Sequence, residues 1–138
     1  MSLFKIFEVA GSAMSAQTLR LNTTASNLAN AETVAGSPEQ AYKARQPVFA
    51  AALKAQQEIG RAQGTVHSKG IIECQTPNSP LYMPNHPEAD ADGYVYRSNV
   101  NPVEELVNMI SASRSYQNNV EVMNTSKELL LQTLRLGS

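Results

Sequence analysis

The residue types that most often carry out chemistry in proteins are scarce in this sequence. Its 138 residues include two histidines, His67 and His86, and a single cysteine, Cys74. A serine nucleophile paired with either histidine would need a supporting motif, and no Gly-x-Ser-x-Gly elbow surrounds any serine. We interpret both histidines as surface residues and Cys74 as a small buried hydrophobe on the apolar face of a strand. The sequence therefore predicts no catalytic residues, and a small hydrolase using Ser68 or His86 is the least favoured alternative.

The stretch from Asp90 to Gly93 resembles the beginning of a calcium-binding loop. Such a loop needs further oxygen ligands and a bidentate glutamate downstream, where this sequence has Asn101. A lone cysteine provides neither an internal disulfide nor a cysteine-built zinc site. The sequence also lacks a P-loop and a dinucleotide-binding fingerprint. We therefore expect a turn at this position, and no metal or other cofactor.

The composition excludes several classes of partner. Apolar residues make up 42% of the chain and charged residues 17%, and the formal net charge is -1. This balance excludes a disordered polyelectrolyte and gives no electrostatic reason to expect nucleic acid or an anionic membrane as a partner. The longest apolar run, Val48–Leu53, is far shorter than a bilayer, as is Leu129–Leu131, so we expect no direct membrane span. Glu8 interrupts the apolar N-terminal stretch, and we therefore expect any export to use no cleaved leader.

The seven prolines divide the chain into three parts, because all of them lie between Pro38 and Pro102. Proline interrupts helices and favours turns, so long helices are expected only outside this block. We therefore predict an N-terminal helix within residues 1–35, an extended β and loop region over residues 36–100, and a C-terminal helix within residues 101–138.

The N-terminal part has the pattern of a long helix that packs against another helix. Apolar residues recur at every seventh position, which places them along one side of a slightly supercoiled helix. These residues are Phe7, Met14, Leu21 and Leu28. We expect the helix to run from Leu3 to Asn30, with Ser2 as its cap.

The C-terminal part carries a clear signal for the start of a helix. Asn101 can cap a helix whose first residue is Pro102, and Glu104 follows in the first turn, where an acid suits the helix dipole. Gly137 ends the run, so we expect a helix from Pro102 to Leu136. Its mostly apolar stripe consists of Leu106, Met109, Ser113, Tyr116, Val120, Met123, Leu130 and Leu134, with Lys127 as the one charged member.

The centre is predicted to contain short strands. Tyr42–Phe49, Thr65–Thr76 and Tyr94–Arg97 have the composition and flanking turn signals of strands. Residues Ala50–Ile59 are rich in alanine and glutamine, and they fit either a helix or an extended arm. The predicted fold is mainly α, with a β-containing centre between two long terminal helices.

Charged residues are rare on the predicted helices. Residues 1–30 contain only Lys5, Glu8 and Arg20, and their other polar residues are Ser, Thr, Asn and Gln. Uncharged polar side chains can be buried at an interface if they find hydrogen-bond partners, whereas unpaired charges are costly to bury. We therefore predict an assembly subunit whose helices contact neighbouring molecules, with Arg114 at an interface. The alternative is a self-contained, soluble two-helix hairpin with ordinary polar surfaces.

Several blocks of the sequence resemble one protein family. Residues 25–31 (ASNLANA), with Thr33 and Gly36, resemble the N-terminal motif of the bacterial flagellar axial proteins, the rod and hook family. The blocks similar to its short proximal-rod members are Tyr42–Ala44, residues 89–95 (ADADGYV) and residues 111–119 (SASRSYQNN). The alanine- and glutamine-rich segment Ala50–Gly64 departs from the family pattern.

The resemblance implies a structural subunit rather than an enzyme. The terminal helices would pack as an antiparallel coiled-coil-like pair and polymerise into the tubular, torque-transmitting proximal rod of the basal body, in the periplasmic space, around an export lumen. The implied partners are further copies of the chain, other rod proteins, the adaptor protein that joins the rod to the export gate, and the flagellar type III export apparatus. A hook- or filament-type axial subunit is the alternative, although those proteins usually carry larger central domains.

The residues expected at the assembly interface come from both helices. They combine apolar stripe residues with asparagines of the N-terminal motif and with Arg114. The full set is Phe7, Met14, Leu21, Asn27, Leu28, Asn30, Leu106, Met109, Ile110, Arg114, Tyr116, Val120, Met123, Leu130 and Leu134.

Overall fold

The computed structural model describes residues 3–54 and 63–137, which form two long helices joined by a strand-containing centre. Helix α1 spans Leu3–Ala29 and helix α2 spans Pro102–Leu136. The strands are β1 (Val34–Ala35), β2 (Arg45–Lys54), β3 (Gln63–Glu73), β4 (Pro80–Tyr82) and β5 (Tyr94–Arg97). The predicted fold class is confirmed, and both helices match their predicted bounds to within one residue. Ser2, the expected cap of α1, lies outside the described residues.

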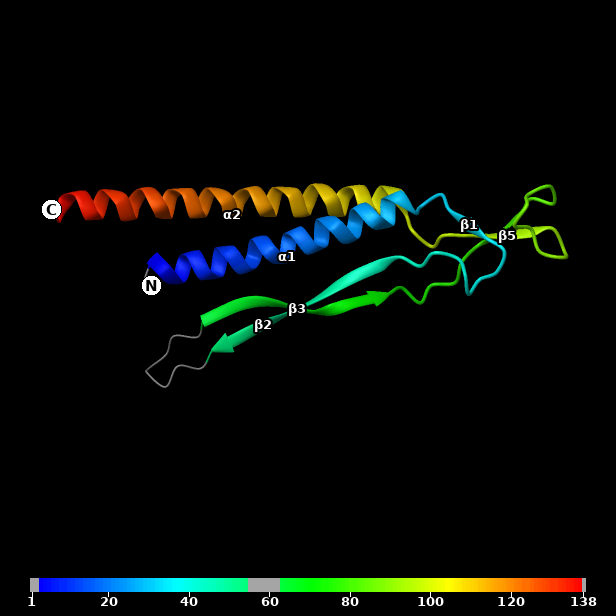
Figure 1. The fold of residues 1–138 in the computed structure, drawn as a ribbon, viewed down its shortest axis with the longest axis horizontal. Coiled ribbons are helices and arrows are strands. Elements are labelled where there is room, and N and C mark those ends of the chain that lie inside the picture. Colours follow the sequence, from blue (N-terminus) through cyan, green and yellow to red (C-terminus); the bar gives the residue numbers. More distant parts are fainter. Residues whose placement is uncertain (1–2, 55–62, 138) are drawn as a thin grey trace.

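The two helices run antiparallel, so that the two ends of the chain lie at the same end of the molecule (Figure 1). Helix α2 begins with the cap that the sequence predicts, because Asn101 Oδ1 accepts hydrogen bonds from the backbone N–H groups of Val103 (3.1 Å) and Glu104 (3.4 Å). At its other end, the N–H group of Gly137 donates to the carbonyl oxygen of Thr133 at 3.2 Å. Neither of the described helices is long and apolar enough to cross a bilayer.

Strands β2 and β3 form an antiparallel hairpin that lies along α1, on the side away from α2 (Figure 1). Their register runs from Arg45 opposite Glu73 to Lys54 opposite Gln63. Residues Ala50–Lys54 therefore continue the strand, which settles that part of the ambiguous segment in favour of an extended arm; residues 55–59 lie outside the described part. Pairing with β3 overrides the helical preference of this alanine-rich sequence.

The remaining strands form a separate three-stranded sheet in the order β1-β5-β4. This sheet projects past the first residue of α2, at the end of the molecule opposite the chain ends (Figure 1). Strand β5 has the predicted bounds, and the turn before it is the predicted one: Asp90 Oδ1 accepts hydrogen bonds from the N–H groups of Asp92 (3.0 Å) and Tyr94 (2.8 Å), and Gly93 has a φ of +83°. In the described part of the chain, no group of three or more His, Cys, Asp or Glu residues is placed to hold a metal ion.

The buried core consists mainly of small side chains. Its buried apolar residues are Ala10, Ala16, Ala31, Ala41, Ala44, Val95, Val100 and Ala112. Cys74 was expected on the apolar face of a strand, but it follows the last residue of β3 and is only half-buried, packing against the cluster of Ala31, Ala44 and Val100. An alanine-rich core buries little area per residue, so most large apolar side chains remain at the surface of the subunit.

Candidate assembly interface

Helix α1 has neighbours on two sides, α2 on one and the β2–β3 hairpin on the other (Figure 1). The side chains that it buries are small or polar, namely Ala10, Ala16, Thr23, Thr24 and Asn27. The predicted stripe of Phe7, Met14, Leu21 and Leu28 is half-buried. Small side chains allow α1 to approach both neighbours closely, and the larger ones remain partly accessible.

The predicted stripe of α2 is divided between the inside and the outside of the subunit. Met109, Tyr116, Val120, Met123 and Leu130 are half-buried, whereas Leu106, Ile110 and Leu134 are exposed. The residues that α2 buries are Glu105, Ala112 and Ser126, which lie on one face of the helix at heptad spacing. The face of α2 that contacts α1 is therefore displaced by one residue from the predicted stripe. Part of that stripe is left uncovered by α1.

The uncovered residues form a continuous apolar stripe near the start of α2. Val103, Leu106, Val107 and Ile110 are 50–70% exposed, and their spacing of three and four residues places them on one helix face. We call these four residues the α2 stripe. Further exposed leucines, Leu129, Leu131, Leu134 and Leu136, follow at the other end of the helix. Contiguous exposed apolar surface of this kind marks sites of contact with other molecules.

Arg114 lies beside the α2 stripe in a shallow hollow. It is exposed, and with Val107, Ile110, Ser111 and Ser115 it lines a space of about 370 Å³. The two serines leave room for another side chain to approach the helix backbone. This hollow, which we call the α2 groove, combines an apolar floor with a single positive charge.

Asn27 joins three elements in the interior of the subunit. Its side chain is 1% exposed, and its Nδ2 group donates to the carbonyl oxygen of Arg45 (2.8 Å) and to Oε2 of Glu105 on α2 (3.1 Å). Its Oδ1 atom accepts hydrogen bonds from the N–H group of Arg45 (2.9 Å) and from the hydroxyl of Tyr42 (2.9 Å). All four hydrogen-bonding positions of the amide are thus used, and the orientation of α1 is fixed against both β2 and α2.

Comparison with known proteins identifies two matching segments. A family model described as "Flagella basal body rod protein" matches residues 7–36, and one described as "Flagellar basal body rod FlgEFG protein C-terminal" matches residues 91–136. The chain is 50% identical to the flagellar basal-body rod protein FlgC of Salmonella typhimurium over 137 residues, which covers 99% of both chains. It is 52% identical to FlgC of Yersinia enterocolitica, again over 99% of both chains.

The chain belongs to the FlgC family of flagellar basal-body rod proteins.

The resemblance noted in the sequence is thereby confirmed. The two segments matched by the rod-protein models contain most of α1 and α2, which are far apart in the sequence and adjacent in the structure. The hydrogen bond between Asn27 and Glu105 joins one matched segment to the other. In this FlgC-family chain, the family motif around Asn27 therefore has a direct structural role within the subunit.

Two predicted interface asparagines, one on α1 and one directly after it, make hydrogen bonds inside the subunit. Asn27 is the buried junction described above, and the Nδ2 group of Asn30, which follows the last residue of α1, donates to the carbonyl oxygen of Ser26 at 2.8 Å. The exposed members of the predicted set all lie on α2 and are Leu106, Ile110, Arg114 and Leu134.

Sequence reasoning missed three residues that connect the elements of this FlgC-family chain. Glu105 is buried at the helix contact, although its place in the first turn of α2 suggests only a dipole effect. The Nδ2 group of Asn78 donates to the carbonyl oxygens of Tyr42 (3.0 Å) and Arg97 (2.8 Å). Asn99 Oδ1 accepts from the N–H group of Ala44 at 2.6 Å. Asparagine is common in turns, so only its position in a fold reveals such a role.

The few reactive residues are held by local hydrogen bonds. His67 Nε2 lies 3.1 Å from the hydroxyl of Thr65, and His86 Nδ1 accepts a hydrogen bond from the N–H group of Glu88 at 3.1 Å. Ser68 follows His67 on β3, and neighbouring strand residues point to opposite faces, so the two do not form a nucleophile and base. Hydrogen bonds from the side chain and the backbone of Thr76 lower the pKa of the Cys74 thiol. This geometry offers no support for the hydrolase alternative.

Proposed function

We propose that this chain is a structural subunit of the proximal rod and that it polymerises through its terminal helices into a tubular shaft that transmits torque. The observation that carries this proposal is the exposed α2 stripe on a helix whose other face is already packed against α1. Relatives that match the chain over 99% of both lengths are named flagellar basal-body rod proteins. This correspondence in length favours a short rod subunit over the hook- or filament-type alternative.

Polymerisation would supply the packing that the subunit lacks internally. Burial of one large aliphatic side chain contributes about 1.5–3 kcal/mol, and long helices depend on tertiary contacts for most of their stability. The largest buried apolar side chains of the described core are two valines, and the others are alanines. The α2 stripe alone exposes two valines, a leucine and an isoleucine. Contacts with neighbouring subunits therefore offer α2 more apolar burial than α1 provides.

The scarcity of charge suits a subunit that lines a conduit. Between Leu106 and Val120 the only charged residue of α2 is Arg114, and the exposed polar residues include Gln117 and Asn118. Fixed charges on the wall of an export lumen would bind charged segments of unfolded cargo, whereas amide and hydroxyl groups would not hold it strongly. The proposal includes export of this chain by the type III apparatus without a cleaved leader, assembly in the periplasmic part of the basal body, and contact with the adaptor protein between the rod and the export gate.

A pair of substitutions on α2 tests the proposed function. Ile110→Asp places a charge in the α2 stripe, and Asn118→Asp places the same charge on the same helix at an exposed position outside the stripe. Each variant replaces the chromosomal copy, and its helix content is measured on the purified chain by circular dichroism. We expect Ile110→Asp to keep its helices, to be absent from isolated basal bodies and to abolish motility, while Asn118→Asp swims normally. Intact flagella in the Ile110→Asp strain, or in a strain lacking Pro102–Ser138, would contradict the proposal.

A further inference from the structure

A second exposed apolar surface lies at the opposite end of the fold from the chain ends. Leu81, Tyr82, Met83 and Tyr94, on and beside the sheet of β4 and β5, are 39–62% exposed. The rings of Tyr82 and Tyr94 meet edge to face, with their centroids 5.2 Å apart. We call the segment from Pro80 to Tyr96 the tip. Its aromatic side chains are exposed although they belong to an ordered sheet.

Local geometry fixes the aromatic side chains of the tip. Gly93 lies directly beneath the ring of Tyr82, since a Cβ atom added at Gly93 would be 3.0 Å from that ring and 3.2 Å from Cβ of Pro84. The N–H group of Met83 donates to the carbonyl oxygen of Gly93 at 2.9 Å. The tip is therefore a preformed surface, and ordering it on contact with a partner requires little loss of conformational entropy.

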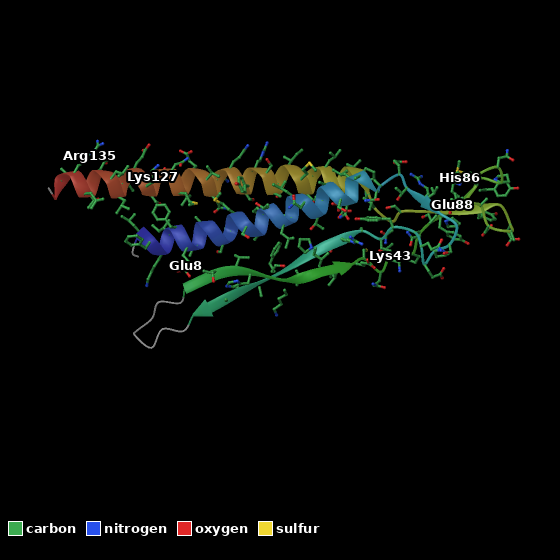
Figure 2. The ribbon with its side chains drawn as sticks, viewed as in Figure 1. Glu8, Lys43, His86, Glu88, Lys127 and Arg135 are labelled. Carbon is green, nitrogen blue, oxygen red and sulfur yellow. The ribbon has the colours of Figure 1, made fainter. Side chains whose placement is uncertain are left out.

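The tip is acidic as well as apolar. Residues 75–96 contain Glu88, Asp90 and Asp92 and no lysine or arginine. Asp90 is engaged in the turn before β5, while Glu88 and Asp92 are exposed in the same segment as the apolar side chains. Figure 2 shows Glu88 and His86 at the end of the molecule beyond the helix pair. A partner for this surface should offer an apolar face with a positive charge next to it.

The α2 groove has those two properties. Val107 and Ile110 provide exposed apolar surface, and Arg114 is the only charge between Leu106 and Val120. Ser111 and Ser115 keep the hollow open to an incoming ring. Within one subunit the tip projects away from the helix pair, past the first residue of α2, so it does not reach the side of its own α2 helix (Figure 1). The groove of a second copy therefore matches the tip in both apolar character and charge.

We propose that the tip of one subunit docks into the α2 groove of a second copy of the chain, with Tyr82 and Met83 against Val107 and Ile110 and with Asp92 beside Arg114. This inference rests on the proposed rod function and specifies one of its contacts. Because the two surfaces are different parts of the same molecule, the contact is heterologous. Contacts of that kind generate rings or open helical assemblies rather than closed two-fold dimers.

Disulfide cross-linking in assembled basal bodies tests the contact. The chain carries Tyr82→Cys and Ile110→Cys together, in a Cys74→Ala background, and isolated basal bodies are oxidised with copper phenanthroline. We expect a ladder of covalent dimers and higher oligomers of this chain on non-reducing gels. The matched control pairs Tyr82→Cys with Asn124→Cys, which is exposed on α2 outside the groove, and should give no ladder. Each single-cysteine variant should also remain monomeric.

A charge exchange tests the ionic part of the contact independently. Arg114→Asp and Asp92→Arg each place like charges together, so each should reduce the yield of the cross-linked ladder by at least about fivefold. The double variant restores opposite charges and should recover most of the yield. Lys127→Asp, a charge reversal on α2 outside the groove, should leave the yield unchanged.

The outcomes separate the two proposals. If the chain is present in basal bodies but the Tyr82 and Ile110 cysteines give no ladder, or cross-link only to a different rod protein, the docking proposal is wrong and the rod function stands. If the double charge variant yields no more ladder than the single variants, the pairing of Asp92 with Arg114 is wrong. If the chain is absent from basal bodies altogether, both proposals fail.

Discussion

At the residue scale, the buried amide of Asn27 has the largest predicted effect on stability. Asn27→Ala would remove a hydrogen-bond partner from the Arg45 backbone groups, from the Tyr42 hydroxyl, which keeps only Ser26, and from the buried Glu105. Unsatisfied buried groups are costly, so we expect the free energy of unfolding to fall by about 2–3 kcal/mol. Urea denaturation followed by circular dichroism measures this loss. Asn118→Ala, at an exposed position, is the control and should change it little.

Hydrogen exchange provides a local test of the same residue. The N–H group of Arg45 donates to Asn27 Oδ1, so its exchange should accelerate in Asn27→Ala. An Arg45 amide that exchanges at the same rate in both proteins would show that Asn27 does not hold β2 against α1.

A second prediction concerns the thiol of Cys74. Its pKa is lowered by the side chain of Thr76, whose hydroxyl lies 3.2 Å from Sγ, and by the backbone of the same residue. Because a hydrogen bond to the thiolate favours the charged form, Thr76→Val should raise the pKa towards its ordinary value, and Thr76→Ser should not. Titration of the thiolate ultraviolet absorbance in the purified chain measures both. A pKa that is unchanged in Thr76→Val would mean that the side chain contributes nothing.

The residue scale is also where the sequence was least informative. Asn27 lies in a motif that the sequence analysis singled out, but its partners come from two other parts of the chain, Tyr42 and Arg45 from one and Glu105 from the other. Glu105 resembles an ordinary first-turn acid, and nothing in its neighbours signals burial. Hydrogen bonds between distant residues depend on the tertiary arrangement, which no local pattern records.

At the element scale, local signals were sufficient for the helices and insufficient for the hairpin. The cap at Asn101, the proline that follows it and the confinement of all prolines to the centre define α1 and α2 almost to the residue. Strand β2 extends to Lys54 because β3 pairs with it, and this pairing cannot be predicted from the alanine-rich sequence of β2 alone. The apolar spacing predicted a stripe on α2, but it did not predict which part of that stripe α1 would cover. That part depends on how α1 divides its surface between α2 and the hairpin.

Two glycine substitutions, one in the turn before β5 and one inside α1, give opposite predicted effects. Gly93→Ala forces a residue with a side chain into a φ of +83° and against the ring of Tyr82, so it should destabilise the tip by about 1–2 kcal/mol. Gly11 lies inside α1, and a methyl group added there would have no atom within 4 Å apart from the nearby backbone of its own helix, so Gly11→Ala should stabilise the helix by about 1 kcal/mol. Exchange of the Met83 amide reports on the first substitution, and urea denaturation reports on the second. If Gly93→Ala were as stabilising as Gly11→Ala, the backbone at Gly93 would not require the conformational freedom of glycine.

At the scale of the whole molecule, the described subunit is long and thinly packed. Its layers are α2, α1 and the β2–β3 hairpin, and α1 is the only one with a neighbour on both sides (Figure 1). Both outer layers, α2 and the hairpin, carry exposed apolar residues such as Ile110 and Ile72. A subunit of this form offers apolar surface on two separate layers, as a component of a continuous wall would.

Helix α2 provides the final prediction, because only part of it is supported by α1. Its 35 residues span about 52 Å, against about 40 Å for the 27 residues of α1, and its last turns continue past the first described residue of α1 (Figure 1). Those turns carry the exposed leucines Leu129, Leu131 and Leu134. Without a packed partner a helix end frays, so we expect rapid amide exchange there in the purified chain.

In isolated basal bodies the same amides should be protected, because neighbouring subunits would cover the leucines. The Val66 amide, which donates to the Ser12 hydroxyl within the subunit, is an internal control and should be protected in both states. Hydrogen exchange with mass spectrometry compares the two preparations peptide by peptide. A purified chain whose α2 is protected to its last turn, at every concentration tested, would mean that the helix pair is complete by itself, and the reason to infer polymerisation through α2 would be removed.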